Sequence, residues 1–276
     1  MAENYVQAAA SATRLGKYSL ANQYAEEAVN LKPTALNLAF LCQTLQMFAV
    51  DKFNSNDFAG ALQLARKATN VGQSCKKAED FTPNLISVAE IAANYRLAAD
   101  CAHRVKRDDL TREFLEDALK IEPTAKDYAL LFVTLHNLTV PKFNNKDFLG
   151  ALEMVRKSIN AYESYKAAKD YEPNLIPPSE VGGNFAFAAI IATYLRKFDE
   201  AYGYAEKSVN SDPSFWNQAV YMAALYNIGR KDEAKAMLEK KVKQNPNQTW
   251  FIELANEIKT RPNAEYWILQ FGPLKE

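Results

Sequence analysis

The sequence predicts an all-α fold: a right-handed α-solenoid of stacked helix-turn-helix units that ends in a capping helix. Three observations predict it. A pattern returns at an offset of 90 residues, apolar residues follow a helical period within each copy, and prolines stand just after the expected helices. In addition, only 9 of the 276 residues are glycine, which argues against an all-β fold rich in turns.

The repeat is clearest in two segments that begin 90 residues apart. Lys52–Asn70 reads KFNSNDFAGALQLARKATN and Lys142–Asn160 reads KFNNKDFLGALEMVRKSIN, so that 11 of the 19 positions are identical. The motif Pro-Asn-Leu-Ile at 83–86 returns at 173–176. The chain therefore consists of about three copies of one unit, near 1–90, 91–180 and 181–248, with a cap over 249–276. We expect these copies to form one domain over 1–276.

Within each copy the apolar residues are spaced as on one face of a helix. In the segment 18–31 they recur at i, i+3, i+4 and i+7, as Tyr18, Ala21, Tyr24, Ala25, Ala28 and Leu31. Asp57 and Asp147 are the expected N-caps of two longer helices, because a carboxylate accepts from the free N–H groups of a first turn. The pattern predicts about thirteen helices and no strand.

The spacing of aromatic residues, small residues and prolines resembles a tetratricopeptide repeat. The segment 2–35 carries Gly16, Tyr18, Ala21, Ala28 and Pro33 at the offsets of that family. The segments 182–214 and 215–248 follow the same pattern, whereas 92–125 departs from it because Thr111 replaces a small alanine. Longer hairpins near 36–76 and 126–168 alternate with these, so the 90-residue super-repeat holds two helical hairpins. The resemblance implies that the first helix of each hairpin lines a concave groove that binds peptides or helices of other proteins.

Two connections, 76–85 and 166–178, are longer than the plain repeat requires. They share Asp80 and Asp170, Phe81 and Tyr171, and the Pro-Asn-Leu-Ile motif. We expect both connections to be ordered, with the aromatic residue and the Leu-Ile pair packed on the adjacent hairpin.

Composition and motifs argue against catalysis, against a cofactor or metal, and against nucleic-acid binding. Lysine plus arginine and aspartate plus glutamate both total 33, so the formal net charge is zero, unlike that of a typical nucleic-acid binder. The sequence has no GxGxxG, Walker, HExxH or GxSxG motif, and its three cysteines and two histidines lack the spacing of metal ligands. Gly182 and Gly183 begin an expected helix, which indicates close helix packing rather than phosphate binding.

A charged stripe in the middle copy supplies the main binding candidates. By the helical period Arg96, Asp100, His103, Arg104 and Arg107 share one face, which the resemblance turns toward the groove. Two interpretations stay open. The stripe is either a solvated face with pairs of a few tenths of a kcal/mol each, or a cationic subsite for a carboxylate or phosphate. Further candidates, Tyr194, Trp216 and Tyr226, would make the groove aromatic toward one end, which suits an extended partner segment with an acidic side chain.

The leading functional hypothesis is a non-catalytic scaffold or adaptor that holds a peptide or helix of a partner protein. The alternative is a self-assembling, homo-oligomeric scaffold, favoured by zero net charge and by the aromatic tail with Tyr266, Trp267 and Phe271. We expect no membrane span, because no apolar run approaches the roughly 20 residues that one needs. The first residues do not resemble a signal peptide, which predicts a cytoplasmic protein, with an exported one as the alternative if a signal had been removed.

Overall fold

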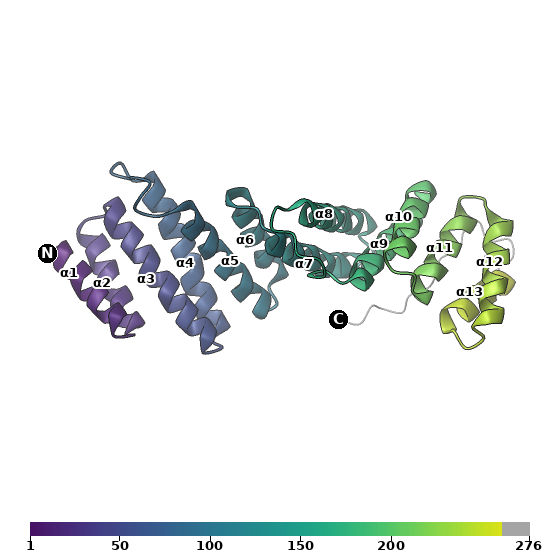
Figure 1. Cartoon of the computed structure of the whole chain (residues 1–276), viewed down its shortest axis with the longest axis horizontal. Helices are drawn as coiled ribbons and strands as arrows, with labels where there is room; N and C mark the ends of the chain where they lie inside the picture. Colours follow the sequence, from purple (N-terminus) through teal and green to yellow (C-terminus); the bar gives the residue numbers. More distant parts are fainter. Residues whose placement is uncertain (261–276) are drawn as a thin grey trace. The chain divides into compact units, whose positions relative to one another are not determined.

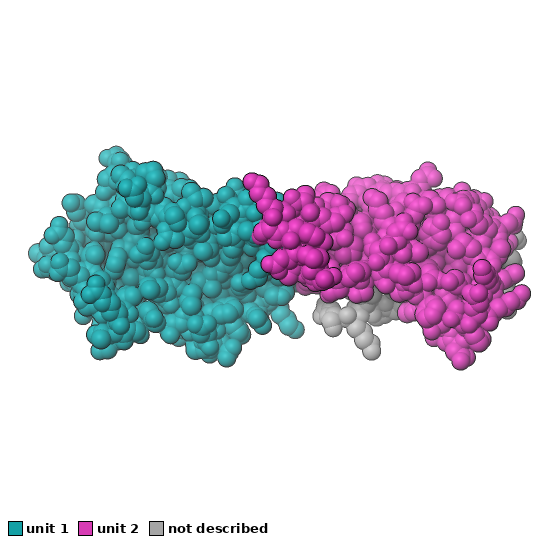
Figure 2. Space-filling view, viewed as in Figure 1, with its two compact units in different colours: residues 1–131 teal, residues 132–276 magenta. Residues whose placement is uncertain are grey.

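The computed structural model describes residues 1–260, apart from the side chains of residues 257–259 (Figure 1). These residues form thirteen α-helices and no strand. The predicted all-α repeat of helical hairpins is therefore confirmed. The chain divides into two compact units, residues 1–131 and residues 132–276 (Figure 2). The handedness of the stack and its division into domains stay predictions.

Unit 1 consists of three hairpins and the start of a fourth. Each hairpin pairs neighbouring helices: α1 (Ala2–Arg14) with α2 (Tyr18–Leu31), α3 (Ala35–Asn54) with α4 (Phe58–Lys77), and α5 (Val88–Arg104) with α6 (Asp108–Ile121). The first helices also contact one another, α1 with α3 and α3 with α5, and so form a layer of their own. The next helix, α7 (Ala125–Asn144), begins in unit 1 and ends in unit 2.

Unit 2 continues the same arrangement. It holds α8 (Phe148–Ala167), α9 (Pro178–Tyr194), α10 (Phe198–Ser211), α11 (Phe215–Asn227), α12 (Lys231–Gln244) and α13 (Thr249–Thr260). The first helices α9 and α11 contact each other, and α13 packs on α11 and α12, where it buries Phe251 and Leu254. The expected cap thus begins with α13, whereas the side chain of Ile258 and the aromatic tail lie outside the described residues.

The helix boundaries keep the 90-residue offset seen in the sequence. Helices α2, α6 and α10 begin at residues 18, 108 and 198, and α4 and α8 begin at Phe58 and Phe148. Phe58 lies edge-on to Phe53 with 5.1 Å between ring centroids, and Phe148 lies edge-on to Phe143 at 5.5 Å. The two similar segments are therefore the same helix with an equivalent phenylalanine neighbour, as predicted. One neighbour differs, because Tyr194 stacks on Phe148 whereas Arg104, 90 residues earlier, lies over the Phe58 ring. The register ends at α11, which has 13 residues where α3 and α7 have 20.

All six hairpin turns have one geometry. The second residue after each first helix has a positive φ, and it is Gly16, Asn56, Lys106, Lys146, Arg196 or Gly229. The N–H of the residue after it returns to the carbonyl five positions back, as in Lys17 N–H to Ala12 O at 2.9 Å. This pattern is a Schellman motif, which satisfies carbonyls at a helix end. Only two of the six positions are glycine, so the other four side chains adopt a left-handed conformation that costs about 1 kcal/mol each.

Both predicted N-caps are present. Asp57 accepts a hydrogen bond from Gly60 N–H at 3.0 Å, and Asp147 accepts one from Gly150 N–H at 2.9 Å. A Cβ atom on either glycine would come within 3 Å of the cap carboxylate. A side chain at either glycine would therefore make the cap carboxylate shift at the start of α4 or α8.

The two long connections span residues 78–87 and 168–177 and, after their first residue, have the same sequence of turns and bends. Ile86 and Ile176 are buried, and Tyr171, although partly exposed, lies edge-on to Tyr165 of α8 at 5.0 Å, as expected, whereas Leu175 is exposed. In the first connection, Asp80 accepts a hydrogen bond from the N–H of Ala35 at 2.9 Å. The connection thereby satisfies a donor at the start of α3.

Candidate protein-interaction surface

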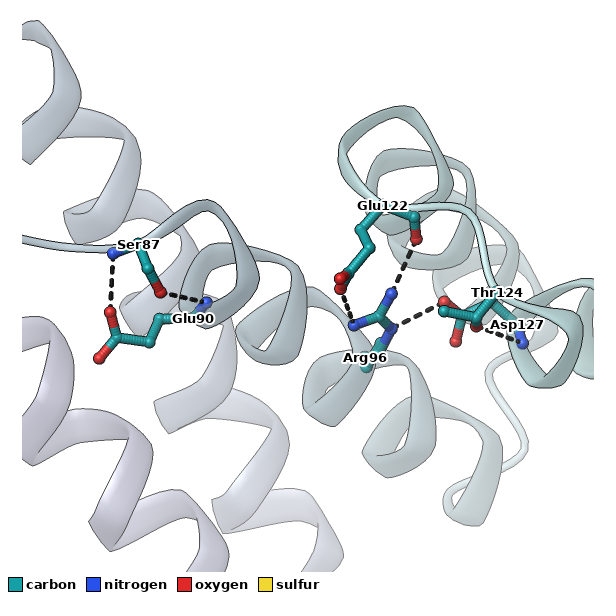
Figure 3. A network of polar contacts seen from close by, with 6 residues as sticks. All are labelled: Ser87, Glu90, Arg96, Glu122, Thr124 and Asp127. Atoms are coloured by element: carbon teal, nitrogen blue, oxygen red, sulfur yellow. Dashed lines mark hydrogen bonds and ion pairs between the residues drawn. The ribbon is translucent and has the colours of Figure 1, made fainter. Parts of the chain in front are cut away.

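Arg96 lies on α5, and all of its nitrogen atoms are engaged within unit 1 (Figure 3). Its Nε donates to Asp127 Oδ2 at 2.7 Å, its Nη1 to Glu122 Oε2 at 2.8 Å and its Nη2 to the Glu122 carbonyl at 2.7 Å. The Arg96 side chain is 24% exposed and that of Asp127 only 6%. The guanidinium therefore fastens the end of α6 to the start of α7, with each of its three nitrogen atoms donating inside the chain.

The neighbouring polar groups on the stripe have different surroundings. Asp100 is half-buried, and burial is the largest cause of a raised pKa of its carboxyl, while the positive charge on Lys126 opposes that shift. Within the described residues it makes no hydrogen bond or ion pair, and the buried Nδ1 of His103 also lacks a partner. The expected helical pairs Arg96–Asp100 and Asp100–Arg104 are not among the ion pairs of residues 1–260.

The remaining two arginines differ from each other. Arg104 is exposed, and its guanidinium carbon lies 5.8 Å from the centre of the Phe58 ring, which is the distance of a cation–π contact. No hydrogen bond of Arg104 is found in the part of the chain that the structure describes. Arg107 is the residue before α6, and it pairs with Asp109 at 3.3 Å. Arg104 is therefore the arginine of the stripe whose donors stay available.

The neighbouring face of α3 was not singled out from the sequence. Gln43, Met47 and Val50 are spaced i, i+4 and i+7, so they share one side of this helix. Gln43 Nε2 donates to Glu90 of α5 at 3.4 Å, which places this side of α3 beside α5. Met47 is 45% exposed and Val50 is 41% exposed. Their exposure is evident only once the buried face of α3 is known.

The three aromatic candidates lie in unit 2 and do not form one surface. Tyr194 stacks on Phe148 at 4.6 Å, and Trp216 meets Trp250 edge-on at 4.7 Å. Tyr226 is 2% exposed and belongs to the core between α9, α11 and α12. Its ring therefore has no surface to offer a partner.

The other potentially reactive groups are part of the packing. Cys42, Cys75 and Cys101 are free and buried, and burial raises the pKa of the Cys42 thiol to about 12. His136 Nδ1 lies 2.9 Å from Asn184 Oδ1 in unit 2. Among the described residues no three histidine, cysteine, aspartate or glutamate side chains are grouped as metal ligands. No helix within residues 1–260 combines the length and the apolar character needed to cross a bilayer.

Comparisons with known proteins give similarities of structure and none of sequence family. No protein-family model matches the chain, and no curated protein matches it in sequence. Among solved structures, the chain is similar to the TPR2AB domain of yeast Sti1 in its pHSP90 complex, with 14% identity, a TM-score of 0.37, and coverage of 94% of this chain and 96% of that one. It is also similar to Pseudomonas aeruginosa pilF, with 14% identity, a TM-score of 0.40, and coverage of 93% and 97%.

A third similar structure is the Cut9–Hcn1 hetero-tetramer of the APC/C, with 12% identity, a TM-score of 0.38, and coverage of 93% of this chain and 42% of that one. All three TM-scores lie below 0.5, so the description of the fold rests on the helices themselves. Their pairing, their turns and their 90-residue register are those of a repeat of tetratricopeptide-like helical hairpins.

Proposed function

We propose that the chain is a non-catalytic interaction scaffold, and that α3 and α5 of unit 1 bind a segment of a partner protein. The observation that carries the proposal is the exposed apolar pair Met47 and Val50 on α3, a helix that contacts α5, where the unpaired polar groups lie. Apolar side chains bordered by hydrogen-bonding groups are the composition of protein-binding surfaces. The segment would lie across both helices, because their exposed sides are neighbours.

The test is a selection of random displayed peptides on the full chain, followed by affinity measurements with the selected peptides. Met47→Glu places a charge in the apolar part of the surface and should weaken binding about tenfold or more, which corresponds to about 1.4 kcal/mol. Leu149→Glu is the matched control, since Leu149 is an exposed apolar residue on α8. Equal affinities of the Met47 variant and the wild type, or equal losses in both variants, would contradict the proposal.

Self-association through unit 2 is a second candidate. Phe215 at the start of α11 and Trp250 and Ile252 in α13 are each 37% exposed, and these two helices are in contact. Exposed aromatic and branched side chains on adjacent helices are suited to an interface between copies. Light scattering over a range of concentrations tests this candidate: a Trp250→Ala variant should shift an oligomer toward the monomer, and a wild-type chain that is monomeric throughout would reject it.

A further inference from the structure

The polar groups of α5 fall into two sets, one used within the chain and one not. Arg96 has three internal acceptors, whereas Asp100, His103 and Arg104 have no hydrogen-bond partner among the described residues. Asp100, His103 and Arg104 are spaced i, i+3 and i+4, so they lie on one face of α5, a turn apart. A half-buried carboxylate without a donor is unfavourable in the free protein, because its lost hydration is not replaced.

The charges around Asp100 are balanced. The positive groups are Arg96 and Arg104 on α5 and Lys126 at the start of α7. The negative groups are Asp100 itself, Glu122 at the end of α6 and Asp127 at the start of α7. A partner ammonium or guanidinium would meet the positive charges of Arg104 and Lys126, and a partner carboxylate would meet Asp100. A neutral group that both donates and accepts hydrogen bonds meets neither penalty.

We infer that the partner segment inserts a carboxamide side chain, that of asparagine or glutamine, between Asp100 and Arg104. The amide N–H₂ group donates to the Asp100 carboxylate, and the amide oxygen accepts from the Arg104 guanidinium. These are the acceptor and donor roles that the two accessible side chains leave open, whereas His103 Nδ1 is buried and takes no part. The inference rests on the proposed function, because it names the side chain that the same surface selects.

The burial of Asp100 supports this assignment. Desolvation raises the pKa of its carboxyl, and donors from a ligand would replace the lost water and lower that pKa again. The position of Arg104 over the Phe58 ring supports it as well, since the ring holds the guanidinium in place without using its N–H groups. A site that hydrogen-bonds one polar group rejects analogues that lack it, so the preference should be strong.

The experiment sequences the peptides that the same random library yields on wild type, Asp100→Ala, Asp100→Asn and the control Asp199→Ala. Asp199 is an exposed carboxylate of α10 in unit 2. We expect wild type and the control to enrich asparagine or glutamine at one position, and both Asp100 variants to lose that preference. In a synthetic copy of a selected peptide, replacing the amide residue by glutamate or lysine should lower the affinity about tenfold or more. Thermal melts of the Asp100 variants confirm that they fold.

Four results would overturn the inference while leaving the proposed function intact. The first three are enrichment of lysine or arginine, enrichment of aspartate or glutamate, and an amide preference that survives in both Asp100 variants. Binding that depends on Asp100 but has no side-chain preference would replace the side-chain amide by the peptide backbone and would equally reject the assignment. If the wild type selects no peptide at all, the proposed function fails and the inference fails with it.

Discussion

Equivalent junctions in the first and third copies are held by one asparagine. Asn37, near the start of α3, donates from Nδ2 to the Lys32 carbonyl at 2.7 Å, just after α2. Asn217, near the start of α11, donates from Nδ2 to the Asp212 carbonyl at 2.7 Å, just after α10. Both asparagines are buried. A single side-chain amide thus satisfies a carbonyl at the end of one helix from inside the next.

The second copy makes the same junction with two charged residues. Asp127 occupies the position 90 residues after Asn37, but an ionised carboxylate has no N–H to donate. Arg96 supplies the missing donor: it reaches the Glu122 carbonyl, equivalent to those of Lys32 and Asp212, and it also pairs with Asp127. The comparison teaches that a charged residue on a helix face can cap the end of a neighbouring helix inside the chain. It also shows that an arginine and an aspartate far apart in the sequence can replace a single asparagine.

Removing the arginine should break this junction and gives the largest expected effect. Arg96→Ala leaves the almost fully buried Asp127 carboxylate without a cation and the Glu122 carbonyl without a donor. We expect the free energy of unfolding to fall by about 3 kcal/mol, as for other pairs broken at one partner. Chemical denaturation at neutral pH measures it. A loss below about 1 kcal/mol would mean that the pair behaves as a surface ion pair.

The matched rescue is the double variant Arg96→Ala with Asp127→Asn. An asparagine at 127 can donate to the Glu122 carbonyl, as Asn37 and Asn217 do at their junctions. The double variant should therefore regain more than half of the stability lost by Arg96→Ala alone. If the stability lost in the double variant equals the sum of the losses in Arg96→Ala and Asp127→Asn alone, the junctions are not equivalent.

Gly182 sharpens the comparison in the third copy. A Cβ atom at Gly182 would lie 2.7 Å from Asn217 Nδ2, whereas a Cβ at Gly183 would meet nothing within 4 Å. Gly182→Ala should destabilise by about 2 kcal/mol through overpacking, and Gly183→Ala should stabilise by about 0.5–1 kcal/mol through helix propensity. Thermal denaturation of both variants checks this. Similar effects of the two substitutions would show that α9 can move away from Asn217.

The hairpin turns give the smallest expected effect. Lys106 occupies the place of Gly16 with φ 56°, and Arg196 does so with φ 59°. Lys106→Gly should raise the free energy of unfolding by about 0.5–1 kcal/mol, because the left-handed conformation costs glycine little. Gly16→Ala should lower the free energy of unfolding by a similar amount, because alanine is strained at φ 69°. No neighbouring atom lies within 4 Å of the added Cβ, so a clash adds nothing to this loss. Unchanged stability in both variants would mean that these turns relax to another conformation.

Much of the fold could be predicted because the helix signals are local and repeated. The positions of Asp57 and Asp147, and the offset between Lys52–Asn70 and Lys142–Asn160, fixed the equivalent helices before any coordinates. The positive φ of Lys106, Lys146 and Arg196 in the hairpin turns was not foreseen, since lysine and arginine carry no turn signal of their own. The 90-residue offset that relates Lys106 and Arg196 to Gly16, and Lys146 to Asn56, was the signal in the sequence that could have predicted these turns.

Less of the candidate surface could be predicted, because it depends on contacts between helices. The stripe of Arg96 and Asp100 was found by periodicity, yet the acceptors of Arg96 come from the next hairpin. Tyr226 has the spacing of an exposed residue, but α13 and α12 close over the core in which it lies. Met47 and Val50 resemble ordinary core residues in the sequence, and only the packing of α3 leaves them exposed.

The shared register also makes the copies interchangeable as genetic modules. Thr34 and Thr124 accept a hydrogen bond from the N–H three residues ahead, at 3.3 Å and 3.2 Å, and each stands just before a twenty-residue helix. A recombination that joins Thr34 directly to Ala125 would excise one copy and keep a helix start of the same kind. One residue would not fit the new junction. Asp127 would follow α2 without Arg96, so the shortened chain would need an asparagine at that position. The arginine and the aspartate therefore depend on each other across the boundary between two hairpins.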